Sequence, residues 1–167
     1  MNIILTGMPG SGKSTVGVLL AKALGKSFID TDLLIQSAAG RKLAEIIEKY
    51  GNDGFEEREN AALLSVADTN AVVATGGSAV FCRSGMEHLR RNGIVVLLDV
   101  PTDELSKRLT GIKNRGVVMR EGETIAQLAE ERAPYYAKYA DITVREIGDI
   151  ESTVARVAEE VAAYGAV

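Results

Sequence analysis

The feature that most constrains this chain is the loop at residues 7–14, which has the sequence GMPGSGKS. The loop matches the phosphate-binding pattern G-x-x-x-x-G-K-[ST] at every fixed position. Its glycines allow the backbone to wrap closely around a polyphosphate, so that consecutive N–H groups point at the phosphate oxygens. Lys13 can reach the β- and γ-phosphates of a nucleotide, and the Ser14 hydroxyl can bind Mg²⁺.

The segments on either side of this loop have the character that a nucleotide-binding loop requires. Residues 3–5 form a short apolar run, which predicts a buried strand. Apolar residues then recur at helical spacing from Val16 to Leu24, and Gly25 stands where a helix C-cap glycine is expected. The order of strand, loop and helix favours a bound nucleotide over a glycine-rich turn that has no ligand.

Strand and helix patterns alternate through the rest of the chain. This alternation predicts an α/β fold with a five-stranded parallel sheet and helices on both faces. The expected strands cover residues 3–5, 27–29, 71–73, 94–98 and 142–144. Helices are expected at about 43–50, 55–66, 84–92 and 103–110, followed by one that breaks at Pro134 and a final one around 154–161.

The composition narrows the class of protein. We expect 167 residues to form a single domain, with a monomer plausible at this size. A net charge of −4 without a long basic run argues against nucleic acid as a partner. The single cysteine fits a reducing cytoplasm, and we expect a cytoplasmic protein with neither signal peptide nor membrane span.

Three predicted strand ends carry residues suited to chemistry, and in open parallel sheets such ends meet at one ligand cleft. They are the loop itself, Asp30 with Asp32, and Gly76 with Gly77. Paired carboxylates in this position can serve Mg²⁺ directly or through water, and can hold or deprotonate an attacking hydroxyl. The alternative is that one aspartate caps the following helix.

A basic, glycine-containing segment at about 111–122 is interpreted as a mobile lid. The nearby cations are Lys107, Arg108, Lys113, Arg115 and Arg120. Phosphoryl transfer needs positive charge around the moving group and exclusion of water, and a closing basic lid supplies both. The competing interpretation is a solvated loop whose arginines do nothing specific.

Taken together, these segments resemble the shikimate kinase family, and the likeness covers nearly the whole chain. Six segments occur in the family's order and at about its spacing. They are the first loop, the Asp30-Thr31-Asp32 triplet, Gly54-Phe55…Glu59, residues 74–77, the Arg115 lid and residues 132–136. The resemblance implies a P-loop kinase fold with a nucleotide-binding core, a substrate-binding region at about 31–60 and a lid. It also implies ATP and Mg²⁺ as cofactors.

The resemblance implies a role for individual residues. Lys13, Asp32 and Arg115 would be catalytic, with Asp32 holding the substrate hydroxyl as a base. Asp30, through water, and Ser14 would bind the metal. Substrate would be held by Asp32, Gly76, Gly77 and Arg132, the last through a carboxylate; Glu56 is added to this predicted set by the departure described next. Nucleotide would be held by Gly10, Ser11, Gly12, Lys13, Ser14, Thr15, Arg108 near the adenine, and Arg115 from the lid.

One departure from the family pattern bears on the substrate. The family has F-R-x-x-E, whose arginine grips the shikimate carboxylate, whereas this chain has Glu56 at that position. Loss of a charge-assisted contact at a buried site costs roughly 2–5 kcal/mol. Arg58 lies about 200° around a helix from Glu56, so only a local shift of the helix would bring it inward. Otherwise Glu56 accepts an ammonium while Arg132 binds a carboxylate, which suits a hydroxy amino acid such as homoserine.

We therefore expect an ATP:alcohol phosphotransferase for a small carboxylated metabolite. A nucleotide-operated switch without a phosphoryl acceptor is the alternative from another class, but the chain has no guanine-reading N-K-x-D motif. A nucleoside monophosphate kinase shares the architecture, but its phosphate-bearing acceptor would need a more basic region than Glu45, Glu48, Glu56, Glu57 and Glu59 provide.

Overall fold

A computed structural model of the chain describes residues 1–109, 117–120, 122–145 and 149–165. Five parallel strands form one sheet in the order β2-β3-β1-β4-β5. The strands are β1 (Asn2–Thr6), β2 (Ser27–Asp30), β3 (Ala71–Ala74), β4 (Gly93–Asp99) and β5 (Ile142–Arg145). The predicted five-stranded parallel sheet is therefore confirmed.

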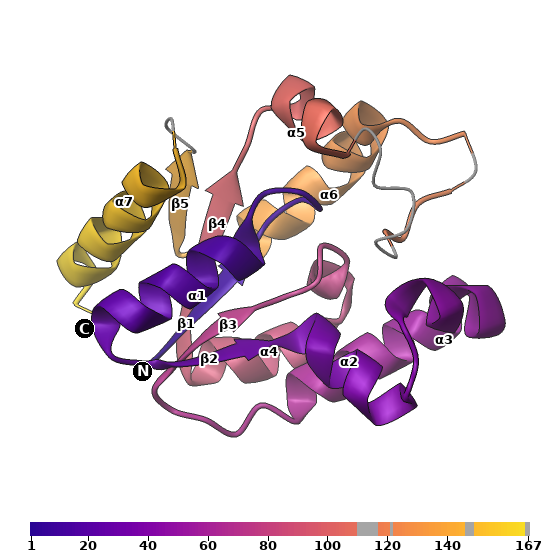
Figure 1. Cartoon of the computed structure of the whole chain (residues 1–167), viewed down its shortest axis with the longest axis horizontal. Helices are drawn as coiled ribbons and strands as arrows, with labels where there is room; N and C mark the ends of the chain where they lie inside the picture. The colour runs from indigo at the N-terminus through magenta and orange to yellow at the C-terminus, as the bar shows by residue number, and fades with distance from the viewer. Residues whose placement is uncertain (110–116, 121, 146–148, 166–167) are drawn as a thin grey trace.

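Helices cover both faces of the sheet because alternate strand residues point to opposite sides (Figure 1). In β1, Ile3 and Leu5 join one apolar cluster, which includes residues of α1 and α7. Ile4 joins the other cluster, together with residues of α4, α5, α6 and the end of α3. These helices are α1 (Lys13–Leu24), α3 (Leu43–Leu64), α4 (Arg83–Arg91), α5 (Thr102–Leu109), α6 (Ile125–Tyr139) and α7 (Ile150–Ala163).

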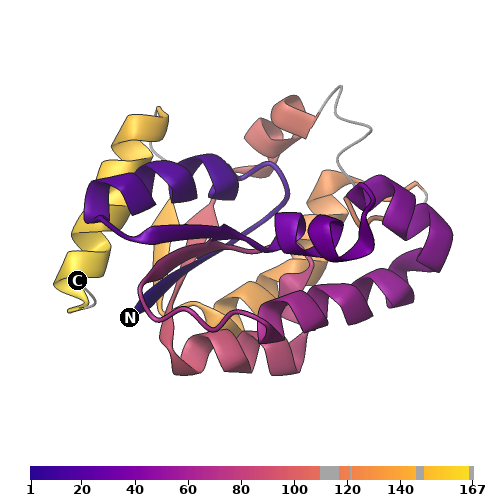
Figure 2. The same cartoon turned by 60° about the horizontal axis from the view of Figure 1, so that its bottom comes forward.

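Helix α2 (Thr31–Ala39) and most of α3 lie to one side of the sheet, beyond the end of β2 (Figures 1 and 2). These two helices share an apolar cluster that is separate from the two sheet clusters; its buried members are Ile35, Leu43, Ile46, Phe55 and Ala62. Because α2 follows β2 directly, the region predicted to bind substrate begins at a strand carboxyl end.

Two helices differ in detail from the predicted pattern. The expected break near Gly51 is present as a local one: Gly51 has φ 68° and ψ −177°, and helix continues on both sides of it within α3. Helix α6 was expected to end at Pro134, with Arg132 at its end, but it continues to Tyr139. The buried side chains of Tyr136 and Tyr139 anchor the turn after the proline, so packing outweighs the missing backbone N–H.

The carboxyl ends of β1, β2 and β3 lead into the first loop, α2 and residues 75–78 respectively. These strands are neighbours, so the three segments meet at one edge of the sheet. Among the residues that the structure describes, no helix is long and apolar enough to cross a membrane.

Candidate active site

The first loop connects β1 to α1 and leaves the start of α1 open to a ligand. Gly12, the N-cap residue of α1, has a φ of 84°, a left-handed conformation that glycine adopts readily. Glycine has no side chain to cap the helix, so the first N–H groups of α1 keep their hydrogen-bonding capacity for a ligand. The helix end also carries partial positive charge, which suits a phosphate.

Lys13 is buried and lies within this loop. Its Nζ atom donates hydrogen bonds to the carbonyl oxygens of Gly7 and Met8, both at 2.8 Å. Burial lowers the pKa of Lys13 to about 8, and the nearby charge of Asp32 acts against this shift. A phosphate would offer the ammonium a stronger partner than the two carbonyls, so the loop is suited to take up an anion.

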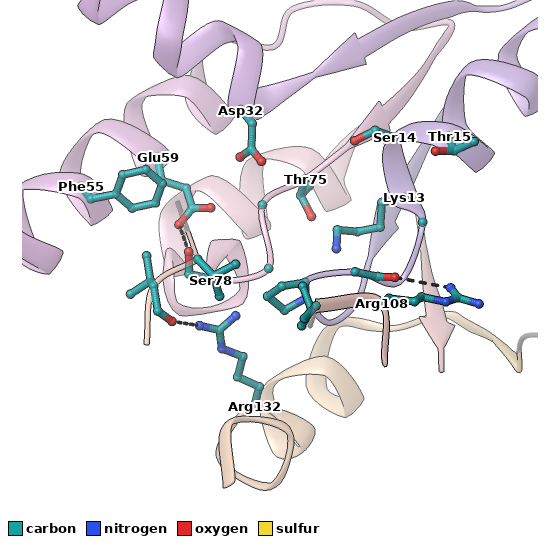
Figure 3. A pocket seen from close by; sticks show the side chains of 18 of the residues that line it. Lys13, Ser14, Thr15, Asp32, Phe55, Glu59, Thr75, Ser78, Arg108 and Arg132 are labelled. Atoms are coloured by element: carbon teal, nitrogen blue, oxygen red, sulfur yellow. Dashed lines mark hydrogen bonds between the residues drawn. The ribbon is translucent and has the colours of Figure 1, made fainter. Parts of the chain in front are cut away.

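A cavity of about 690 Å³ opens beside the loop and brings most of the predicted site residues together. Figure 3 shows Lys13, Asp32 and Glu59 directed toward the same space, with Arg132 reaching it from α6. The predicted residues that line the cavity are Gly10, Gly12, Lys13, Ser14, Thr15, Asp32, Gly76, Gly77, Arg108 and Arg132. Ser11 is buried next to them, and its hydroxyl lies 3.3 Å from Lys13 Nζ.

The two aspartates after β2 have different surroundings. Asp30 caps α2, because its Oδ1 accepts a hydrogen bond from the Asp32 backbone N–H at 3.0 Å. The capping alternative is thus confirmed for Asp30. Asp32 lines the cavity, and burial raises its pKa to about 6, with a further contribution from the negative charge of Asp30. Asp32 is therefore the carboxylate placed to meet an acceptor.

The residues near the loop fit Mg²⁺ held largely by a nucleotide. The Ser14 side chain is exposed toward the cavity, and the carboxylates of Asp30 and Asp32 lie at the same end of the sheet. In the described part of the chain, no group of three or more His, Cys, Asp or Glu residues could hold a metal ion. Mg²⁺ bound by phosphates and water with one or two protein oxygens needs no such group.

The position of Glu56 does not support its predicted contact with substrate. Glu56 is exposed and lines a different hollow, which also includes Asp53 and Glu87. Arg58 does not take the missing arginine's place either. Its guanidinium lies 3.7 Å from the Tyr50 ring centre, and its Nη1 donates to the Gly54 carbonyl at 2.6 Å.

Glu59 lines the cavity although it is not among the predicted site residues; it is the last residue of the family pattern F-R-x-x-E. It lies one helical turn after Phe55, and both residues line the cavity. Its side chain is fully buried, and its Oε2 accepts a hydrogen bond from the Ser78 hydroxyl at 2.6 Å. Burial raises the pKa of Glu59 to about 7 despite that bond. The spacing from Phe55 was the available signal, since the two positions share one helix face.

Arg132 reaches the cavity from the middle of α6. Its side chain is 1 % exposed, and its Nη2 donates to the Val118 carbonyl at 2.8 Å. One turn later, the Tyr136 hydroxyl donates to the Gly77 carbonyl at 2.7 Å, which links α6 to the segment after β3. This hydrogen bond holds the part of α6 that carries Arg132 next to the segment after β3.

Arg108 lies beside the first loop, and part of the predicted lid lines the cavity. The Nη1 of Arg108 is 3.4 Å from the Gly10 carbonyl oxygen, and its Nε donates to Glu104 at 3.2 Å. Val117 and Val118, near the end of the predicted lid, line the cavity. Arg115 and most of that segment lie outside the described residues.

The arrangement places an anion-binding loop, a carboxylate and a buried arginine around one space. Such a cavity can hold a polyphosphate at the loop, a hydroxyl at Asp32 and a carboxylate at Arg132. It has the parts that phosphoryl transfer to an alcohol requires, because that reaction depends on positioning and on stabilisation of charge.

Comparison with known proteins agrees with this geometry. The sequence model of the family described as "Shikimate kinase" matches residues 9–162. The shikimate kinase of Caldanaerobacter subterraneus subsp. tengcongensis is 40% identical over 163 residues, which are 96% of this chain and 93% of the relative. That of Moorella thermoacetica is 42% identical over 161 residues, covering 95% and 92%.

A solved structure shows the same likeness in three dimensions. Shikimate kinase from Acinetobacter baumannii, in complex with shikimate, superposes with a TM-score of 0.90 at 33% identity, covering 98% of this chain and 93% of that one. With the P-loop, the parallel sheet and the cavity in place, this chain belongs to the shikimate kinase family, a family of ATP-dependent phosphotransferases.

Proposed function

We propose that this protein transfers the γ-phosphoryl group of ATP to a hydroxyl group of a small, carboxylate-bearing acceptor. Shikimate is the first candidate, because relatives about 40% identical to the chain are named shikimate kinase. The observation that carries the proposal is the single cavity lined by Lys13, Asp32 and Arg132. It provides residues suited to a phosphate, a hydroxyl and a carboxylate around one space.

The acceptor hydroxyl would approach Asp32 and attack the γ-phosphorus in line with the leaving oxygen. With a pKa of about 6, Asp32 is largely ionised at neutral pH, so it can orient the hydroxyl and accept its proton. Lys13 would release its loop carbonyls and bind the β- and γ-phosphates, which stabilises charge on the transferring group.

The remaining predicted contacts complete this proposal. Ser14 and, through water, Asp30 would hold Mg²⁺, which neutralises phosphate charge when it is bound. Arg108 would lie near the adenine, and Arg115 would act on the phosphates from the lid. Arg132 would bind the acceptor carboxylate with its guanidinium. We further propose a monomer acting in the cytoplasm.

The test is an assay of the purified protein with ATP, Mg²⁺ and shikimate, in which mass spectrometry detects phosphorylated shikimate and a coupled reaction follows ADP. Lys13→Ala should lower kcat by about 100-fold or more, because it removes a fixed cation from the transferring group. Unchanged kcat in that variant would contradict the role of Lys13. ATP hydrolysis without any phosphorylated acceptor would favour a nucleotide-operated switch instead.

A hydroxy amino acid is the second candidate acceptor. The observation that favours it is a negatively charged acceptor end: Asp32 and Glu59 both line the cavity, while position 56 of this chain provides no arginine. The carboxylate that would meet an ammonium group is then Glu59 rather than the exposed Glu56.

A further inference from the structure

Glu59 presents one hydrogen-bonded oxygen and one unpartnered oxygen at the cavity wall. The Ser78 hydroxyl donates to Oε2, whereas Oε1 is buried and accepts no hydrogen bond. A buried carboxylate oxygen without a donor costs free energy. This oxygen is therefore suited to a donor that arrives with a ligand.

Asp32 stands beside Glu59 on the same side of the cavity (Figure 3). Both carboxylates pack against the backbone of Gly76. A side chain placed there would overlap Glu59 Oε1, and its Cβ would lie 3.0 Å from Asp32 Oδ1. The glycine thus allows two carboxylates to share one part of the wall, where their charges repel each other and attract a cation.

Neither Asp32 nor Glu59 forms a direct ion pair in the described part of the chain, although the charges of Lys13 and Arg132 act on Asp32 and Glu59, respectively. Lys13 is bound to the loop carbonyls, and Arg58 lies against Tyr50. Glu56 occupies the position of the arginine in the family pattern and adds to the negative charge around Glu59.

Arg132 supplies a buried positive charge to the same cavity. Its side chain is 1 % exposed, and its Nε has no hydrogen-bond partner, although Nη2 donates to Val118. Glu59 and Arg132 both line the cavity, and each has one buried polar atom without a hydrogen-bond partner, an acceptor on Glu59 and a donor on Arg132. A molecule that carries both an ammonium and a carboxylate satisfies both.

We propose that Glu59 binds an ammonium group of the acceptor while Arg132 binds its carboxylate, so that the preferred acceptor is a hydroxy amino acid. Asp32 adds to the attraction for the cation and remains available to the hydroxyl. This inference rests on the proposed phosphoryl transfer and narrows its substrate class. Glu59 is thus a residue that determines specificity.

The test compares acceptors that differ only by the ammonium group. The pairs are L-serine with 3-hydroxypropanoate, L-threonine with 3-hydroxybutanoate, and L-homoserine with 4-hydroxybutanoate, with shikimate alongside. We expect the best amino acid to exceed its partner in kcat/KM by about 30-fold or more, as for other desolvated charge pairs. It should also exceed shikimate.

Two variants test whether Glu59 and Glu56 cause this preference for amino acids. Glu59→Gln should lower kcat/KM for the amino acid toward that of its partner, with little effect on the partner itself. Glu56→Arg, a change at an exposed position, should shift the preference toward acceptors without an ammonium. Glu57→Gln is the matched control, because Glu57 is exposed on the same helix and does not line the cavity.

Each outcome decides a different claim. If shikimate is phosphorylated efficiently and no amino acid exceeds its partner, the kinase function stands and the ammonium site is refuted. An equal loss for both members of a pair in Glu59→Gln also refutes the site, because a merely structural residue would act on both. If the protein phosphorylates none of these acceptors, the proposed function fails and the inference fails with it.

Discussion

Replacing Glu59 with glutamine should stabilise the ligand-free protein at alkaline pH. The side chain is fully buried, and burial raises its pKa from the ordinary 4.5 to about 7. Because the folded-state pKa is the higher one, the stability associated with neutral Glu59 is complete below pH 4.5 and is lost as the pH rises through about 7. Glutamine stays neutral and can still accept the Ser78 hydrogen bond.

The size of the effect follows from the pKa difference. A pKa difference of one corresponds to about 1.4 kcal/mol. The raised pKa of Glu59 therefore lowers the free energy of unfolding by about 3 kcal/mol once Glu59 is fully ionised. Part of this loss has already occurred at pH 5. The free energy of unfolding of Glu59→Gln minus that of the unmodified protein should therefore grow by about 2–3 kcal/mol between pH 5 and pH 8.

Urea unfolding followed by circular dichroism at pH 5, 6, 7 and 8 measures this difference. Glu57→Gln, an exposed change on the same helix, should stay within about 0.5 kcal/mol of the unmodified protein at each pH. A difference for Glu59→Gln that is the same at pH 5 and pH 8 would show that this carboxyl group ionises normally in the folded protein. A higher free energy of unfolding for Glu59→Gln at pH 8 would fit a glutamate that is retained for binding although it lowers stability.

Three further variants test the geometry of the cavity and its support. Gly76→Ala should lower kcat/KM for the acceptor by about 100-fold, because the added Cβ would displace the carboxylates of Asp32 and Glu59. Calorimetry should show an unchanged affinity for ATP, and an equal loss of ATP binding would contradict this explanation. Arg132→Lys should raise acceptor KM by about 30-fold or more with KM for ATP unchanged, and equal KM values for the acceptor would exclude a carboxylate contact. Pro134→Ala should raise the free energy of unfolding in urea by about 1–3 kcal/mol, since it restores a helix N–H; a decrease would mean that the proline is needed for the shape of α6.

The features that the sequence predicted are those that depend on neighbouring residues. Apolar runs such as residues 94–98 mark buried strands by themselves, and the spacing of residues 7–14 specifies a phosphate loop. The five strands and the meeting of their ends followed from these patterns. The capping role of Asp30 also follows from local sequence, because an aspartate before a helix has that preference.

Features that depend on distant contacts escaped prediction. The burial of Glu59 results from Ser78 and Gly76, which lie 17 or more residues away in the chain and meet it only in the folded protein. Helix α6 passes Pro134 because Tyr136 is held by Gly77 on another segment. The direction in which Glu56 and Arg58 point was equally undetermined, since a motif fixes their order but not which face of α3 is buried.

The separate apolar cluster of α2 and α3 has a consequence for how such a protein diversifies. Because Ile35, Leu43 and Ile46 stabilise this part of the molecule without belonging to the sheet clusters, replacements on α2 and α3 can reshape the acceptor side while the strands and the phosphate loop keep their packing. A gene duplicate can thus exchange one alcohol for another and keep its ATP chemistry. Sequence identity concentrated in the sheet and the loop would then overstate agreement in substrate, and position 56, where this chain departs from the family pattern, is the first one to compare.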